Sequence, residues 1–177
     1  MKRKGEQGFT LIELLIVVAI ISIIAAIAVP GLLRARMTGN ESSAIASMRT
    51  TTSSQVSYSA ACGNGSYATS YDILADPPAA AAGSQGFISV EFNAAAPILK
   101  SGYNLTLQPA AAAVAGALDC NAIATTSGFY AWGIPLTLGT TGTRGFAVDT
   151  NMTIFQDTTG VAPGEPLTAG GTVAPVN

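Results

Sequence analysis

The feature that most constrains the fold is an apolar run near the N-terminus, which reads GFTLIELLIVVAIISIIAAIAVP over residues 8–30. As a helix, the roughly 21 residues from Phe9 to Val29 would be about 30 Å long, which matches the hydrocarbon thickness of a bilayer. Many of these side chains are β-branched and are weak helix formers. Within lipid, however, backbone groups can bond only to one another, so a helix is still expected. The sequence predicts a membrane-spanning helix.

One carboxylate, Glu13, interrupts this run near its start. An ionised side chain inside an apolar membrane helix costs about 2.5 to 3.5 kcal/mol, and such residues usually pair with another group and have a function. A second interpretation is that Glu13 reaches the membrane surface, because it lies only about one turn inside the run. We favour the first interpretation, which predicts a cationic partner for Glu13.

The residues before the run are basic, with Lys2, Arg3 and Lys4 against a single acid, Glu6. The positive-inside rule therefore places this end in the cytoplasm and the bulk of the chain outside. An ordinary secretory signal is the main alternative, because residues 26–28 (Ala-Ile-Ala) look like a signal cleavage site. The length of the run, the acid inside it and the proline that follows argue against that alternative.

The sequence MKRKGEQG followed by FTLIE and an unbroken apolar run resembles the prepilin signature of the type IV pilin family, whose relatives include type II secretion pseudopilins and archaellin-like subunits. This resemblance implies that a prepilin peptidase cuts between Gly8 and Phe9 and methylates the new amino group of Phe9. It also implies that Glu13 neutralises the amine of a neighbouring subunit during assembly. The resemblance is close over about 35 residues and only general beyond them.

The expected fold class is α+β, with a long N-terminal helix packed on an antiparallel β-sheet head, as in the pilin fold. One half of this helix is transmembrane and the other is amphipathic. We expect a leader peptide over residues 1–8, a transmembrane and polymerisation segment over 9–30, an amphipathic continuation of the helix over 31–60, and a head over 61–177 with a flexible C-terminal tail.

Pro30 and Gly31 predict a kink, because Pro30 cannot donate a hydrogen bond to the carbonyl of Ala26 and Gly31 loosens the helix further. Poor helix formers at Gly39 and over 50–54 would also allow a break. Beyond the proline, apolar side chains nevertheless recur at helical spacing and favour continuation to about residue 59. The apolar side chains are Leu33, Met37, Ala44 and Met48, and the stripe is widened by Ile45, Thr52 and Val56.

Four strands are expected after the helix, over residues 87–92, 103–108, 129–138 and 146–155, the last divided by a turn near Asn151. Their alternating apolar and polar residues fit a sheet with one buried face. The tail over 161–177 is rich in Pro, Gly, Ala and Thr and is expected to be extended or mobile.

The two cysteines, Cys62 and Cys120, predict one disulfide in an exported domain, which would tie the helix end to the middle of the sheet. Closing a loop of about 58 residues is worth roughly 4 kcal/mol in the chain-entropy model. A redox or metal role has little support, because the sequence has no CxxC pair and no histidine.

Other chemistry is sparse in this sequence. The absence of histidine removes the usual base and metal ligand, so neither an enzyme nor a bound cofactor or metal is expected. Asp149, Asn151 and Asp157 could supply oxygens to Ca²⁺, as the pseudopilin branch would suggest, but we interpret them as turn and strand-end residues. After residue 49 the only basic residues are Lys100 and Arg144, so nothing indicates direct nucleic-acid binding.

These observations predict a structural subunit of a type IV pilus that polymerises through its N-terminal helix after leader cleavage. Its expected partners are other pilin subunits, the prepilin peptidase and the pilus or secretion assembly machinery. We expect a single pass through the bacterial inner membrane before assembly and an extracellular or periplasmic filament afterwards. Three alternatives stay open: a pseudopilin of a type II secretion system, a minor pilin, and a monomeric membrane-anchored binding domain.

Overall fold

The structure is a computed structural model of the 177-residue chain, and it describes residues 8–79, 85–94 and 96–176. The chain divides into two compact units, Met1–Arg36 and Met37–Asn177. A single helix, α1 (Leu11–Ala61), belongs to both units. The leader peptide expected over residues 1–8 lies outside the described residues except for Gly8.

The first unit consists of the apolar half of α1 and the residues that precede it. The helix passes through Pro30 without ending, and the kink predicted at Pro30 and Gly31 stays a prediction. The most apolar 18-residue window has a mean hydropathy of 3.0, and none of that window is buried. By length and composition, α1 can therefore cross a bilayer.

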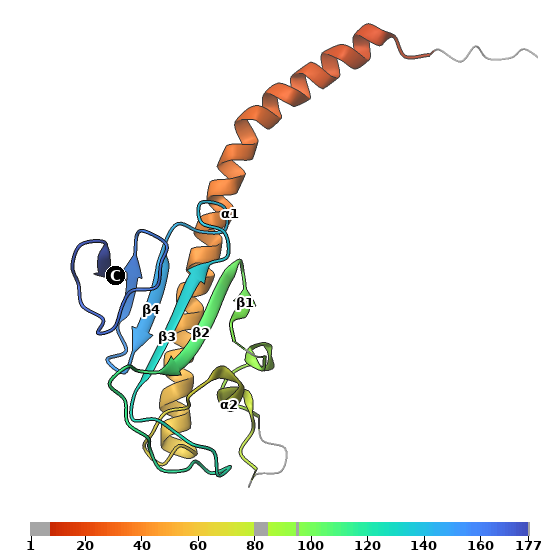
Figure 1. Ribbon diagram of the computed structural model, residues 1–177. Helices are drawn as coiled ribbons and strands as arrows, with labels where there is room; N and C mark the ends of the chain where they lie inside the picture. Colours follow the sequence, from red (N-terminus) through yellow and green to blue (C-terminus); the bar gives the residue numbers. More distant parts are fainter. Residues whose placement is uncertain (1–7, 80–84, 95, 177) are drawn as a thin grey trace, which may run out of the picture. The chain divides into compact units, whose positions relative to one another are not determined.

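The second unit contains a six-stranded sheet whose strands are adjacent in the order in which they occur in the chain (Figure 1). Every neighbouring pair is antiparallel. A tight turn joins the first two strands through Ser101 and Gly102, which both have positive φ (48° and 74°), as a type I′ hairpin requires. The strands are β1 (Ile98–Lys100), β2 (Tyr103–Pro109), β3 (Phe129–Pro135), β4 (Gly145–Asp149), β5 (Ile154–Asp157) and β6 (Val173–Pro175).

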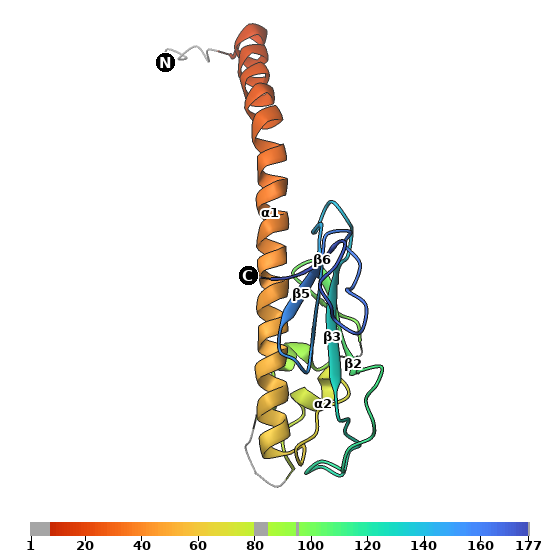
Figure 2. The ribbon, with the colours of Figure 1, turned by 90° about the vertical axis from the view of Figure 1, so that its left-hand side faces the viewer.

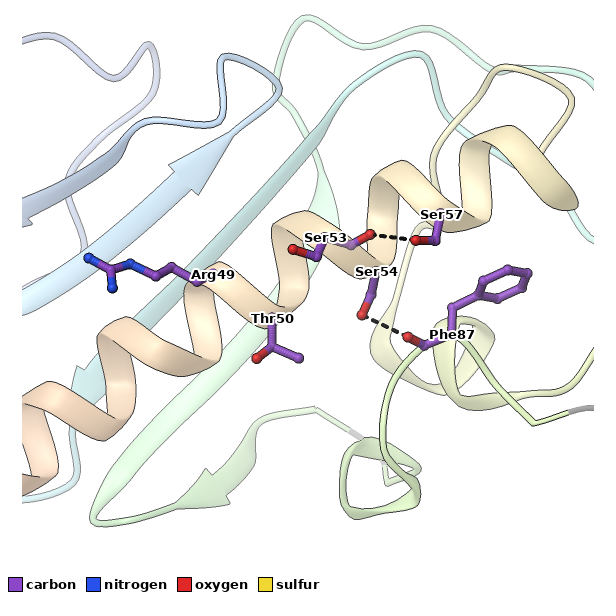
Figure 3. A pocket seen from close by; sticks show the side chains of 6 residues that line it. All are labelled: Arg49, Thr50, Ser53, Ser54, Ser57 and Phe87. Atoms are coloured by element: carbon purple, nitrogen blue, oxygen red, sulfur yellow. Dashed lines mark hydrogen bonds between the residues drawn. The ribbon is translucent and has the colours of Figure 1, made fainter.

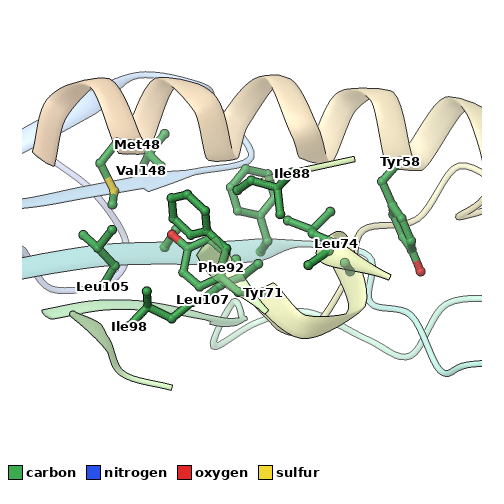
Figure 4. Packing of buried hydrophobic residues seen from close by; sticks show 14 of the residues in the cluster. Met48, Tyr58, Tyr71, Leu74, Ile88, Phe92, Ile98, Leu105, Leu107 and Val148 are labelled. Carbon is green, nitrogen blue, oxygen red and sulfur yellow. The ribbon is translucent and has the colours of Figure 1, made fainter. Parts of the chain in front are cut away.

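The second half of α1 packs along one face of this sheet (Figure 2). Its buried residues recur every three or four positions, which is the spacing of one helix face. They form one core with side chains from the strands and from the segment after the helix, as seen for Met48, Leu105 and Val148 in Figure 4. The buried residues of α1 are Glu41, Ala44, Ser47, Met48, Thr51, Ser54, Gln55 and Tyr58.

The prediction of a strand over residues 87–92 is wrong. This segment ends in a 3₁₀ turn, η1 (Val90–Phe92), and Val90, one of the apolar residues of the alternating pattern, is 78% exposed. The amides of Phe87 and Ile88 both donate to the carbonyl of Leu74, and the hydroxyl of Ser89 accepts from the amide of Glu91. Local hydrogen bonds therefore replace the ladder that the alternating pattern suggested.

Three short elements were not predicted. They are the helix α2 (Tyr71–Ala75) and the strands β1 and β6, of five, three and three residues. The last of these belongs to the segment expected to be extended or mobile, and it pairs with β5 at one edge of the sheet. The remaining predicted strands are confirmed with shifted ends, and the division of the last one into β4 and β5 is confirmed as well.

Candidate functional site

The N-terminal end of α1 is closed by a reciprocal contact between Thr10 and Glu13. Oε2 of Glu13 accepts a hydrogen bond from the amide of Thr10 at 2.9 Å and another from its hydroxyl at 2.6 Å, while the amide of Glu13 lies 3.3 Å from Oγ1 of Thr10. A threonine followed three residues later by a glutamate is the capping box that starts many helices. Glu13 therefore has a local role, which the sequence interpretation missed although the spacing was visible.

The contact with Thr10 uses only one of the two carboxylate oxygens of Glu13. Both hydrogen bonds end on Oε2, and among the described residues none donates to Oε1. Phe9 lies just before the helix and is 91% exposed, next to the expected cleavage position after Gly8. The structure thus places the expected cleavage, methylation and assembly residues within six positions at one end of the helix.

The rest of the apolar run contains no other charge before Arg34. The hydroxyl of Ser22 donates to the carbonyl of Val18 at 2.8 Å, so it is satisfied within the helix. The apolar side chains around it are exposed in the isolated chain. This segment accordingly presents an uncovered apolar surface with one carboxylate near its start.

The disulfide between Cys62 and Cys120 is present, with the two Cα atoms 4.8 Å apart. Cys62 follows directly after α1, but Cys120 lies in the connection between β2 and β3 and not in the middle of the sheet, which corrects the expected placement. The amide of Cys120 donates to the carbonyl of Cys62 at 2.9 Å, and the hydroxyl of Tyr58 donates to Asp119 at 2.7 Å. The disulfide therefore links the connection between β2 and β3 covalently to the C-terminal end of α1.

Polar side chains of α1 bond to the segment that follows the helix. Nε2 of Gln55 donates to the carbonyl of Ala68, and the amide of Ala68 donates to Oε1 of Gln55, each at 2.9 Å. The hydroxyl of Tyr71 lies 3.0 Å from that of Thr51, and burial raises the pKa of Tyr71 to about 12. The hydroxyl of Ser54 donates to the carbonyl of Phe87 at 2.8 Å (Figure 3).

A buried acid, Glu41, lies near the start of the part of α1 that packs on the sheet. Glu41 accepts hydrogen bonds from the amide and hydroxyl of Thr143, both at 2.8 Å, and from Nε and Nη2 of Arg144 at 2.9 and 2.6 Å. Burial alone would raise the pKa of Glu41, but these hydrogen bonds and the guanidinium charge outweigh it and lower the pKa. Glu41 and Arg144 lie 103 positions apart, and no motif or spacing in the sequence indicates that they pair.

The three candidate calcium ligands do not form one site. Asp149 accepts from the amide and the side chain of Asn151, whereas Asp157 accepts from the amide and hydroxyl of Thr159. The hydrogen bonds from Thr159 lower the pKa of Asp157. Within the part of the chain that the structure describes, no cluster of three or more metal-binding side chains occurs.

Comparison with known proteins agrees with the residues at the N-terminal end of α1. Residues 3–29 match a family model described as the prokaryotic N-terminal methylation motif. A 38-residue stretch is 58% identical to the type IV wide pilus major component PilA4 of Thermus thermophilus, and it covers 22% of this chain and 29% of that protein. No solved structure matches the chain.

The long helix with its apolar half, packed on an antiparallel sheet in the second unit, is a pilin-like α+β arrangement. Together, the methylation motif and the relative support the type IV pilin family for this chain. Both matches cover only a small part of the chain.

Proposed function

We propose that this chain is a structural subunit of a type IV pilus and that it polymerises through the apolar half of α1 after removal of its leader. The observation that carries the proposal is the uncovered apolar helix, which a single chain leaves without any protein partner. Such a surface is stable in lipid or against other copies of itself. The relative whose name describes a major component of a wide pilus favours a pilus over a secretion system.

In this proposal, the new amino terminus at Phe9 becomes a cation that must enter the filament core. Oε1 of Glu13 in a neighbouring copy is the acceptor for this amine, while Oε2 keeps its capping contact with Thr10. Bringing the two charges together offsets part of the desolvation that each would suffer alone. The membrane holds the subunit before assembly, and the assembled filament is extracellular or periplasmic.

Processing is tested on the filament protein itself. The mature chain should begin at Phe9 with a methylated amine, which mass spectrometry of the N-terminal peptide would measure. A chain beginning at Val29 would instead indicate ordinary signal cleavage and would refute the pilin proposal.

Assembly is tested with Glu13→Ala and Glu13→Gln, the second of which keeps the shape of the side chain and removes only its charge. Both should be inserted and cleaved but should yield few sheared filaments, because the amine is left buried without its partner. Ser22→Ala is the matched control, since Ser22 is satisfied within its own helix and its loss should leave filaments unchanged. Normal filament levels in both Glu13 variants would show that charge pairing is not needed.

A further inference from the structure

Most charged side chains of the second unit have partners within it. Lys100 pairs with Glu91 at 3.0 Å, and Arg144 pairs with Glu41 at 2.6 Å. The remaining partnered acids accept hydrogen bonds from nearby amides and hydroxyls. They are Asp119, Asp149, Asp157 and Glu165.

Three charged residues are left over in the second unit: Arg49, Asp72 and Asp76. None of these side chains has a hydrogen bond or ion pair with any residue that the structure describes, and all three residues are exposed. Arg49 lies on α1 beside a shallow depression, and Figure 3 draws no interaction for it. Asp72 lies in α2, and Asp76 follows it directly. The unit therefore carries one unpartnered cation and one unpartnered acidic pair.

These two features face different sides of the molecule. Thr51 points toward α2, because its hydroxyl lies 3.0 Å from that of Tyr71, the first residue of α2. Arg49 precedes Thr51 by two positions, which is about 200° around a helix. The guanidinium therefore projects away from α2, and the Asp72 and Asp76 side chains of the same copy are not its partners.

The guanidinium of Arg49 is the charged donor beside this depression. The hydroxyl of Thr50 donates to the carbonyl of Ala46 and that of Ser57 to the carbonyl of Ser53, so their protons are engaged in the helix. A guanidinium presents several donors in one plane and can hold a carboxylate through two of them. An exposed carboxylate is the complementary group.

We propose that Arg49 of one copy binds the Asp72 and Asp76 carboxylates of the next copy in the filament. This inference rests on the proposed polymerisation. The second unit contains three cations and eight acids, a net charge of −5, so neighbouring heads repel each other unless the unpartnered cation of one copy meets an acid of the next. Because the two patches lie on different faces, each copy binds one neighbour through Arg49 and another through α2. Contacts of this head-to-tail kind continue into an open polymer.

Charge reversal in the full-length protein tests the pairing. Arg49→Glu alone, or Asp72→Lys with Asp76→Lys, should reduce sheared filaments by at least about tenfold, because like charges then face each other. The combined triple variant restores the attraction and should return filaments to near the wild-type level. Normal filaments in either one-sided variant, or no recovery in the triple variant, would overturn the inference.

A chemical cross-link tests the contact without disrupting it. In Arg49→Lys filaments assembled from light and heavy isotope-labelled subunits, a zero-length carboxyl–amine reagent should join the amine at position 49 to residue 72 or 76 of a differently labelled chain. Lys100 and Glu91, 3.0 Å apart, provide an internal control that the reagent reacts within one chain. Filaments that give the control link but no link between chains at these positions would refute the contact.

The outcomes separate this inference from the proposed function. Normal assembly of Arg49→Glu together with lost assembly of Glu13→Gln would overturn the head contact alone. A wild-type chain that forms no filaments in its own cells would instead overturn the proposed function. Protein level in the membrane and an intact disulfide, measured for every variant, show that a loss of filaments is not a loss of folding.

Discussion

Replacing Gln55 by leucine should destabilise the second unit more than any surface change on α1. The side chain of Gln55 is fully buried, and its amide group both donates to and accepts from the backbone of Ala68, which is fully buried too. Leucine has a similar volume, so the change in packing is small. What is lost is the partner of two buried backbone groups.

The expected magnitude follows from those two groups. A buried donor or acceptor that loses its partner costs about 1 to 3 kcal/mol, so the loss of two should lower the free energy of unfolding of Gln55→Leu by roughly 2 to 6 kcal/mol. Small domains are stable by only about 5 to 15 kcal/mol in total. The single substitution therefore removes a large share of the stability.

Urea unfolding of the full chain in detergent measures this effect. Trp132, the single tryptophan, lies in β3 and reports on the sheet by its fluorescence. Ser57→Ala is the matched control, because Ser57 is exposed on the same helix and bonds only to the carbonyl of Ser53; it should change stability by less than about 0.5 kcal/mol. A loss below about 0.5 kcal/mol for Gln55→Leu, with an unchanged slope in urea, would refute the reasoning.

Two further predictions concern the same unit. Replacing Cys62 and Cys120 together by serine should lower the unfolding free energy by roughly 2 to 5 kcal/mol, and equal urea midpoints for wild type and variant would contradict this. The pKa of Glu41 is lower in the folded chain than its ordinary 4.5, so its contribution is present above that value and is lost as the pH falls further. Unfolding curves of Glu41→Gln should therefore depend less on pH below about 4.5 than wild-type curves, and parallel pH profiles would show that the acid contributes nothing.

The elements with strong periodicity could be predicted from the sequence. The apolar run and its continuation predicted one helix, and alternation predicted β2, β3, β4 and β5. β4 and β5 were predicted as two halves of one longer alternating segment, 146–155, whereas α2, β1 and β6 are elements of three to five residues outside any such segment and carry too few positions for a period to appear. The alternation over residues 87–92 was misleading. The amides of Phe87 and Ile88, which would have bonded to a neighbouring strand, donate to the carbonyl of Leu74 instead.

The candidate site was predictable only where its signal is local. Glu13 was recognised from its position in an apolar run, and its contact with Thr10 could have been found from their spacing. The pairs formed by Gln55 with Ala68 and by Glu41 with Arg144 depend on how distant segments meet. Nothing in the order of the residues indicates these partners before the fold is known.

The polar contacts of α1 with the rest of the second unit have a mechanical consequence. Specific hydrogen bonds are made by four side chains of this helix over 17 helical steps, a distance of about 26 Å: Glu41, Thr51, Gln55 and Tyr58. A smooth apolar face can slide by a turn and keep most of its contacts, whereas these side chains have partners in only one register. Tension along the helix would therefore act in shear on all four contacts at once. In a filament, the sheet would then move together with the second half of α1 under tension.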